Sequence, residues 1–315
     1  MLEQKNSNSV IFFSNRFFIL FILLPVILLN SCSIKKLAVN SVANALTSEG
    51  TSVFATDEDP ELVAEALPFA LKTMEALLQS TPENQKLLVG TCSGFVQYSH
   101  AFVLAPVEML EKTDLEQARK EKQRAKKMFL RARGYGLNAL ELEYAGITEQ
   151  LQQDAPAAVS RTDKKDVAAL YWTGVAWISA ISLSTSDMGL VAELPTVTAI
   201  LERSLELDES WNKGAIHEVF IHFDASRTEA EGGGIASAES HYKRAMELNH
   251  GQSVSPHVAL AEAVCVKQQD RETFEQLLQK VLEFDVDQYP EFRLSNILAQ
   301  RRAQFLLENI EDYFI

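Results

Sequence analysis

The sequence predicts an all-α protein, built as a tetratricopeptide-like helical repeat superhelix. Alternation of apolar and polar residues never persists for more than three or four residues, so no strand is indicated. From residue 60 onward the apolar residues recur with helical spacing instead. Three segments in the second half also end in the same manner, which indicates a repeat: Arg203–Asp208 (RSLELD), Arg244–Asn249 (RAMELN) and Lys280–Asp285 (KVLEFD).

The spacing of these endings favours a repeated helix pair. The closing Asp or Asn residues are 41 and 36 residues apart, and a helix pair with a period of roughly 34 residues is typical of tetratricopeptide repeats. An insertion at Glu229–Gly234 (EAEGGG) explains the longer interval. Repeats of this kind need apolar faces for stacking. The segment Arg271–Phe284 supplies one at i, i+3, i+4, i+7 and i+8, formed by Phe274, Leu277, Leu278, Val281 and Leu282.

The N-terminal segment predicts secretion. Phe17–Leu29 is a run of 13 uncharged, mostly apolar residues that follows Arg16. It is short of the roughly 20 residues that span a bilayer and has the length of a signal-peptide core. The run closes on Leu29-Asn30-Ser31-Cys32, which resembles the cleavage site of bacterial lipoproteins. An ordinary signal with an incidental cysteine and an uncleaved anchor are the alternatives.

This interpretation divides the chain into three parts. Residues 1–31 are the signal peptide, residues 32–59 carry lipidated Cys32 and a tether, and residues 60–315 form the helical domain. Diacylglycerol and a further fatty acid such as palmitate on Cys32 would anchor the protein, because stable anchoring needs more than one acyl chain. Cleavage changes the formal charge from −14 to −15, since Glu3, Lys5 and Arg16 are removed. Such a negative net charge argues against nucleic-acid binding and against attachment to anionic lipid through a polybasic segment.

The helical domain begins with Asp59-Pro60-Glu61, a capping Asp followed by Pro at the first helical position. Lys112–Arg133 is dense in charge and reads as a solvated face. Ala155–Lys165 and Ser184–Gly189 are expected loops. The expected helices are Pro60–Gln79, Glu83–Leu104, Pro106–Gly134, Tyr135–Gln153, Asp166–Leu183, Pro195–Leu207, Trp211–Phe223, Ile235–Leu248, Pro256–Lys267, Arg271–Phe284 and Arg293–Phe314.

Cysteine usage is sparse. After Cys32 only Cys92 and Cys265 remain, both in apolar helical text where a free thiol behaves as a small hydrophobe. We therefore expect two buried thiols, although an oxidising compartment would permit a disulfide. The chain has no CxxC pair, so neither a zinc knuckle nor a redox motif is indicated.

The sequence contains no constellation that indicates catalysis. Gly232-Gly233-Gly234 lacks the lysine and the preceding strand of a phosphate-binding loop and is expected to be a plain loop. His217 and His222 are five residues apart and diverge by about 140° on a helix, whereas zinc ligands on one helix favour i, i+4. We expect structural histidines, no bound metal and no cofactor. A metal-dependent hydrolase that uses both histidines and Glu218 remains the enzymatic alternative.

Two features are candidates for ligand binding. Trp172 and Trp177 lie on the apolar and aromatic helix Asp166–Leu183, which could line an apolar channel or simply pack in a core. Arg301 falls on the apolar stripe of the last helix, and an inward-facing arginine needs a carboxylate partner. It could clamp a ligand carboxylate, form an internal salt bridge or extend its stem to solvent. The stripe comprises Leu294, Ile297, Leu298 and Phe305.

Several stretches together resemble the TatT family, the lipoprotein T-components of tripartite ATP-independent periplasmic (TRAP) transporters. Besides the Cys32 motif, they are Gly214–Glu218 (GAIHE), Gly232–Tyr242 (GGGIASAESHY), Phe292–Leu307 (FRLSNILAQRRAQFLL) and Asp312–Phe314 (DYF). The resemblance covers most of the chain after the signal and is strongest from Tyr171 onward.

The resemblance implies a periplasmic, lipid-anchored homotrimer with a tetratricopeptide-like superhelix. It also implies binding of the transporter's periplasmic substrate-binding protein, and an internal pore for apolar or organic-acid ligands. The family has no catalytic residues to carry over. The main alternative keeps the fold but has no pore, and makes the chain a scaffold lipoprotein for envelope or outer-membrane assembly.

Overall fold

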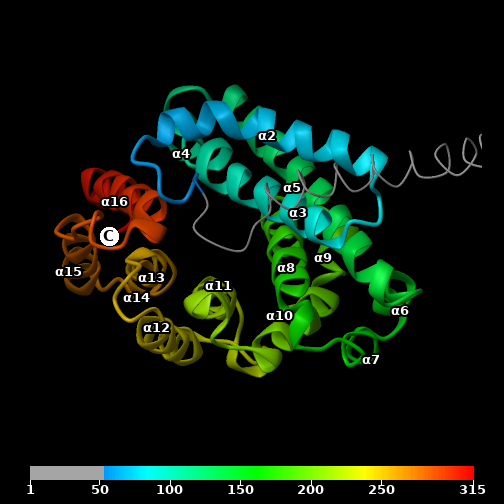
Figure 1. The fold of residues 1–315 in the computed structure, drawn as a ribbon. Helices are drawn as coiled ribbons and strands as arrows, with labels where there is room; N and C mark the ends of the chain where they lie inside the picture. Colours follow the sequence, from blue (N-terminus) through cyan, green and yellow to red (C-terminus); the bar gives the residue numbers. More distant parts are fainter. Residues whose placement is uncertain (1–52) are drawn as a thin grey trace, which may run out of the picture.

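The protein is described here from a computed structural model that places residues 53–315 (Figure 1). The predicted signal peptide, Cys32 and most of the tether lie outside these residues. Within residues 53–315 the chain is helical and contains no strand, which confirms the all-α prediction. In chain order the α-helices are α2 (Pro60–Ser80), α3 (Gln85–Tyr98), α4 (Val107–Thr113), α5 (Leu115–Glu143), α6 (Ile147–Gln153), α7 (Ala155–Val159), α8 (Val167–Ser182), α9 (Met188–Val191), α10 (Leu194–Leu207), α11 (Ala215–Ala225), α12 (Ile235–Asn249), α13 (Ser255–Leu260), α14 (Val266–Gln268), α15 (Arg271–Leu282) and α16 (Arg293–Glu308).

Helices α2 and α3 form the predicted first pair, and side-chain caps fix where each begins. The Asp59 carboxylate accepts a hydrogen bond from the Leu62 amide at 3.0 Å, and the Asn84 side chain accepts one from the Leu87 amide at 3.0 Å. Each bond satisfies one of the amide groups that a helix leaves without an intrahelical partner at its start. Local sequence therefore sets both boundaries.

The predicted boundary at Gly134 is wrong, because α5 continues through it to Glu143. The chain breaks earlier, at Asp114, whose φ of −148° is not helical and whose carboxylate caps α5 through the Gln117 amide at 3.0 Å. Glycine lowers helix propensity, but it also permits close helix contact. At Gly136 an added Cβ would lie 2.1 Å from the Thr173 hydroxyl oxygen on α8. Tertiary packing of α5 on α8 therefore outweighs the propensity.

Two expected loops contain short helices, and two expected helices change type along their length. The expected loops include α7 and α9, and 3₁₀ turns occupy Lys164–Asp166 and Trp211–Gly214. The predicted helix Glu83–Leu104 ends in a π-helical segment at Ser99–Leu104, and Pro256–Lys267 contains another at Ala261–Cys265. A π-helical segment has more residues per turn than an α-helix, so the side chains after it point in directions that α-helical spacing does not predict.

The three recurring endings coincide with the C-termini of α10, α12 and α15, as the repeat analysis predicted. The EAEGGG insertion lies between α11 and α12, also as predicted. Its glycine amides all bond to backbone oxygens: Gly232 to Glu229, Gly233 to Thr228 and Gly234 to Asp224. None is free to bind a phosphate, which confirms the plain-loop interpretation.

The apolar interior consists of two clusters. One is built from residues of α2 to α11, and the other from residues of α11 to α16. Helix α11 joins them, with Phe220 in the first cluster and Ile221 in the second. Cys92 and Cys265 are buried free thiols, one in each cluster, which confirms the buried-thiol prediction.

One helical run in the described part of the chain, Gln85–Thr113, is long and apolar enough to cross a membrane by length and composition. Half of its most apolar window is buried inside the protein, and the core helix of a water-soluble domain passes the same test.

The helices follow a closed curve, so the last helix returns to the first (Figure 1). The Leu294 amide of α16 donates to the Ala55 carbonyl at 3.0 Å, and an Arg293 guanidinium nitrogen donates to the Thr56 carbonyl at 2.9 Å. The Lys112 ammonium, in the last turn of α4, donates to Asn309 Oδ1 at 2.6 Å. These contacts join the two ends of the described chain and close a ring of helices.

Candidate functional site

Two histidines on different helices interact with one another. His100, in the π-helical segment after α3, and His222, on α11, both retain accessible surface. Burial nevertheless lowers the pKa of both imidazoles, that of His100 to about 4, because the surrounding protein excludes water from the charged form. Repulsion from His222 lowers the pKa of His100 further, so the two rings lie near one another. Both side chains are therefore solvent-accessible and uncharged at neutral pH.

His100 is held in one orientation and one tautomer. Its Nε2 lies 2.8 Å from the hydroxyl oxygen of Ser179 on α8, and that hydroxyl donates to the Val175 carbonyl at 2.7 Å. Because the hydroxyl proton is already used, Nε2 carries the hydrogen and donates it to Ser179. The imidazole also packs 4.7 Å from the Phe129 ring. At neutral pH His100 is therefore an uncharged group with Nδ1 available as an acceptor.

A second cluster, between α8 and α11, combines one carboxyl group with aromatic rings. Burial raises the pKa of Glu218 on α11 to about 6, although a hydrogen bond from the Ser255 hydroxyl at 2.9 Å opposes this. Glu218 interacts electrostatically with the hydroxyl of Tyr171 on α8. Tyr171 packs with Trp172 and Trp211, each at a ring-centroid distance of 4.8 Å. This cluster offers a carboxyl group beside a large apolar surface.

A charged cluster lies where the ring closes. The guanidinium of Arg302 on α16 donates to Glu262 Oε1 at 2.8 Å through Nε, and Nη1 lies 2.6 Å from Glu108 Oε2. Tyr313 donates its hydroxyl hydrogen to the other oxygen of Glu108. The side chains of Arg302, Glu108 and Glu262 are only 30%, 31% and 26% exposed. Since two carboxylates share one guanidinium, Arg302 has no charge left over for an anionic ligand.

The three side chains predicted to bind ligand are not brought together. Trp172 belongs to the aromatic cluster with Tyr171 and is partly exposed. Trp177 is buried, donates its indole hydrogen to Glu193 Oε2 at 2.7 Å and lies 4.7 Å from the Arg133 guanidinium, so it has a packing role in this structure. Arg301 lies on the outside of α16.

The prediction that Arg301 faces inward is wrong. Its side chain is 50% exposed and forms a bidentate ion pair with Glu61, whose side chain is 69% exposed. The buried face of α16 is formed by Asn296, Ala299, Ala303 and Leu306, and not by the larger apolar residues of the predicted stripe. Asn296 is fully buried, and its side chain is satisfied there: its Oδ1 accepts from the Val254 amide, and its Nδ2 donates to the Gln252 carbonyl. The inward arginine is therefore Arg302, one position along.

The predicted histidines lie apart, as their five-residue spacing indicates. His217 Nδ1 lies 2.7 Å from His241 Nδ1 on α12, and His217 Nε2 lies 3.3 Å from Glu209 Oε2. His222 instead lies near Glu262 and Arg302, whose charges influence its pKa in opposite directions. In residues 53–315 no group of three or more His, Cys, Asp or Glu side chains is arranged to hold a metal ion.

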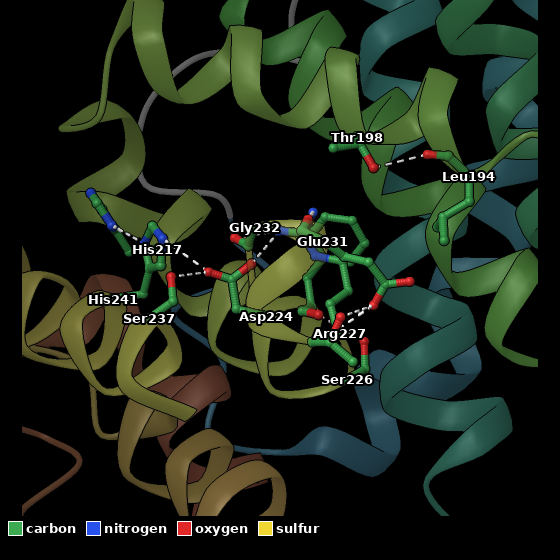
Figure 2. Close-up of polar contacts among 12 residues, drawn as sticks. Leu194, Thr198, His217, Asp224, Ser226, Arg227, Glu231, Gly232, Ser237 and His241 are labelled. Atoms are coloured by element: carbon green, nitrogen blue, oxygen red, sulfur yellow. Dashed lines mark hydrogen bonds and ion pairs between the residues drawn. The ribbon is translucent and has the colours of Figure 1, made fainter. Parts of the chain in front are cut away.

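A polar network that the sequence analysis missed joins α11 to α12 (Figure 2). The Asp224 carboxylate, 1% exposed, accepts hydrogen bonds from Arg227 and Ser237 and lies 3.5 Å from His241. Arg227 also donates to the Glu231 carbonyl at 3.1 Å and stacks 4.0 Å from the Phe223 ring. The network holds the loop before α12 in place and links α11 to α12, which is a structural role. No local spacing signals it, since its members come from both sides of that loop.

Comparison with known proteins gives two matches. A family model described as "TRAP transporter T-component" matches residues 56–314. The chain is also 29% identical over 301 residues to an uncharacterized protein of Treponema pallidum (strain Nichols), a match that covers 90% of this chain and 93% of that protein.

Proposed function

Because the chain belongs to the TRAP transporter T-component family, we propose that it binds the periplasmic substrate-binding protein of a TRAP transporter and assists uptake of a ligand. The family is a transporter accessory component associated with the cell envelope, and it is not an enzyme family. The match over residues 56–314, nearly the whole described chain, is the observation that carries the proposal.

The proposal includes the features that the sequence predicted. We propose that Cys32 is lipidated and anchors the protein at the inner or outer membrane, that the helix pairs form a tetratricopeptide-like superhelix, and that three copies assemble. Support for the superhelix comes from the recurring endings of α10, α12 and α15. Support for transport comes from the match to the T-component family over residues 56–314.

The residues named above favour an apolar ligand over an organic acid. His100 and His222 are neutral at pH 7, and the charge of Arg302 is balanced by Glu262 and Glu108. Transfer of a ligand carboxylate into such a space without a free cation costs several kcal/mol. The cluster of Tyr171, Trp172 and Trp211 provides apolar surface with few polar groups, which is typical of sites for small apolar molecules.

Native mass spectrometry of the form that begins at Ser33, with the transporter's substrate-binding protein in excess, tests the proposal. We expect a trimer that takes up the partner and retains a small apolar adduct. A monomer that ignores the partner would overturn the transport role and leave a helical scaffold lipoprotein. Retention of a small organic acid instead of an apolar molecule would contradict only the ligand class.

A further inference from the structure

The outer face of α5 carries charge opposite to that of the molecule. Residues 119–133 contain eight Lys or Arg residues and one Glu, whereas the whole chain has a formal charge of −14. These 15 residues extend over about 22 Å of helix. The sequence predicts a solvated face here, and the structure shows which of these cations have ion-pair partners.

Cations on one side of α5 are used by the fold. Lys126 pairs with Asp187 at 3.2 Å, and Arg133 pairs with Glu193 at 2.9 Å while stacking on Trp177. The exposed cations Arg119, Lys120, Arg124, Lys127 and Arg131 form what we call the basic stripe. Together with Glu116, Gln123 and Met128 they line one shallow depression of the surface.

The basic stripe is only partly neutralised. Lys120 and Arg124 pair within α5, with Glu116 and Glu121, and Arg131 lies 3.5 Å from Glu75. Arg119 and Lys127 have no ion-pair partner among residues 53–315. They are eight residues apart on one face of the helix, about 12 Å along its axis. Like charges at i, i+4, such as Lys120 with Arg124 and Lys127 with Arg131, destabilise a helix by about 0.2–0.5 kcal/mol per pair.

We propose that the basic stripe is the docking surface for an acidic face of the substrate-binding protein, an inference that rests on the proposed function. A narrow stripe of cations on a negative molecule attracts a partner whose acidic patch is of similar width, and repels partners that present negative charge more broadly. An anionic membrane is such a broad surface. It would also meet Glu111, 41% exposed, which lies outside the depression. The geometry therefore favours a protein over a lipid surface.

The test compares two triple variants of the full chain in detergent micelles, with the purified substrate-binding protein as probe. R119E/K120E/K127E reverses the stripe. K86E/K243E/K280E makes the same change in net charge at exposed lysines on α3, α12 and α15 that have no ion-pair partner within residues 53–315. Association rates are measured by stopped flow at low and at physiological ionic strength.

For the wild type we expect an association rate that falls as salt increases. The stripe variant should associate at least about tenfold more slowly at low salt and lose most of the salt dependence, while the control variant keeps both. Equal rates for the stripe variant and the wild type, or an equal loss in the control, would overturn the docking surface. If the wild type itself does not bind, the proposed function fails, and this assignment fails with it.

Lipid is tested separately with vesicles of phosphatidylglycerol and of phosphatidylcholine. Equal flotation of wild type and stripe variant on phosphatidylglycerol supports the assignment to a protein. Extra flotation of the wild type on phosphatidylglycerol alone, lost in the stripe variant, would assign the stripe to anionic lipid and overturn the proposal.

Discussion

At the scale of single residues, the fold suppresses the ionisation of three side chains of the candidate site. Burial lowers the pKa of His100 and of His222 and raises that of Glu218, so each group favours its neutral form more strongly than in water. Because these groups are neutral, an apolar molecule could contact them without removing water from a charged side chain. The same shifts make the stability of the protein depend on pH.

Replacement of Glu218 by Gln should change stability only above acidic pH. The folded protein raises the pKa of Glu218 from 4.5 to about 6, so it binds this proton more tightly than the unfolded chain does. The resulting stabilisation is fully present below pH 4.5 and is lost as pH rises through 6. Ionisation of the native residue therefore costs about 2 kcal/mol at pH 7.5.

We expect the E218Q variant to unfold in urea with a free energy about 2 kcal/mol above wild type at pH 7.5 and equal to it near pH 4. Gln keeps an oxygen that can accept the Ser255 hydroxyl hydrogen. A difference of the same size at both pH values would show that Glu218 is not buried as described.

At the scale of helices, small residues decide how closely neighbours approach. The buried side of α5 consists of Ala118, Ala125, Phe129, Ala132, Gly136, Ala139 and Leu140, so most of its contact with α3 and α8 involves little more than backbone. Gly136 is the extreme case because Thr173, fully buried, lies against it. Gly134, two residues earlier, has open space around its Cα. One helix therefore contains a required glycine and a dispensable one.

This contrast yields a matched pair of alanine variants. Gly136→Ala would place a Cβ 2.1 Å from the Thr173 hydroxyl oxygen and should destabilise the protein by about 1–3 kcal/mol through overpacking. Gly134→Ala meets no atom within 4 Å and should stabilise it by about 0.5–1 kcal/mol, since alanine is the better helix former. Chemical denaturation measures both. A destabilising Gly134→Ala would contradict the continuous α5 and restore the predicted boundary.

At the scale of the whole molecule, the two ends of the described chain are joined by polar contacts. Arg302 bridges Glu262 and Glu108, while Arg301, its neighbour, pairs with Glu61 on the surface. Exposed ion pairs contribute little because water and salt screen them. Removal of one member of a partly buried cluster leaves the other charges desolvated and unpaired. Ring closure should therefore depend on Arg302 and hardly on Arg301.

Arg302→Leu should lower the free energy of unfolding by about 2 kcal/mol, less than the 3–5 kcal/mol of a fully buried pair because these side chains keep some exposure. Faster amide exchange is expected in α16, beginning with the Leu294 amide that bonds to Ala55. Arg301→Ala serves as the control and should cost less than about 1 kcal/mol. Equal effects of the two variants would argue against an inward Arg302.

Local chemistry in the sequence determined the helical class and most helix boundaries. Capping residues such as Asp59 and Asn84, the 3.6-residue periodicity and the recurring endings all act within a few residues. The buried thiols and the loop at Gly232 were also predictable, because composition and the lack of a phosphate-binding motif sufficed. The same chemistry indicated the family, which the match over residues 56–314 confirmed.

Tertiary structure alone decided which side chains face the ring interior. The choice between Arg301 and Arg302 depends on a helix face made of Asn296 and small residues, which has no apolar signature. His100 reaches Ser179, and Glu262 reaches Arg302, from π-helical segments whose register helical periodicity does not predict. Gly134 remains within a helix because α5 packs along α8. These outcomes depend on contacts between residues distant in the chain, and such contacts leave no local pattern in the sequence.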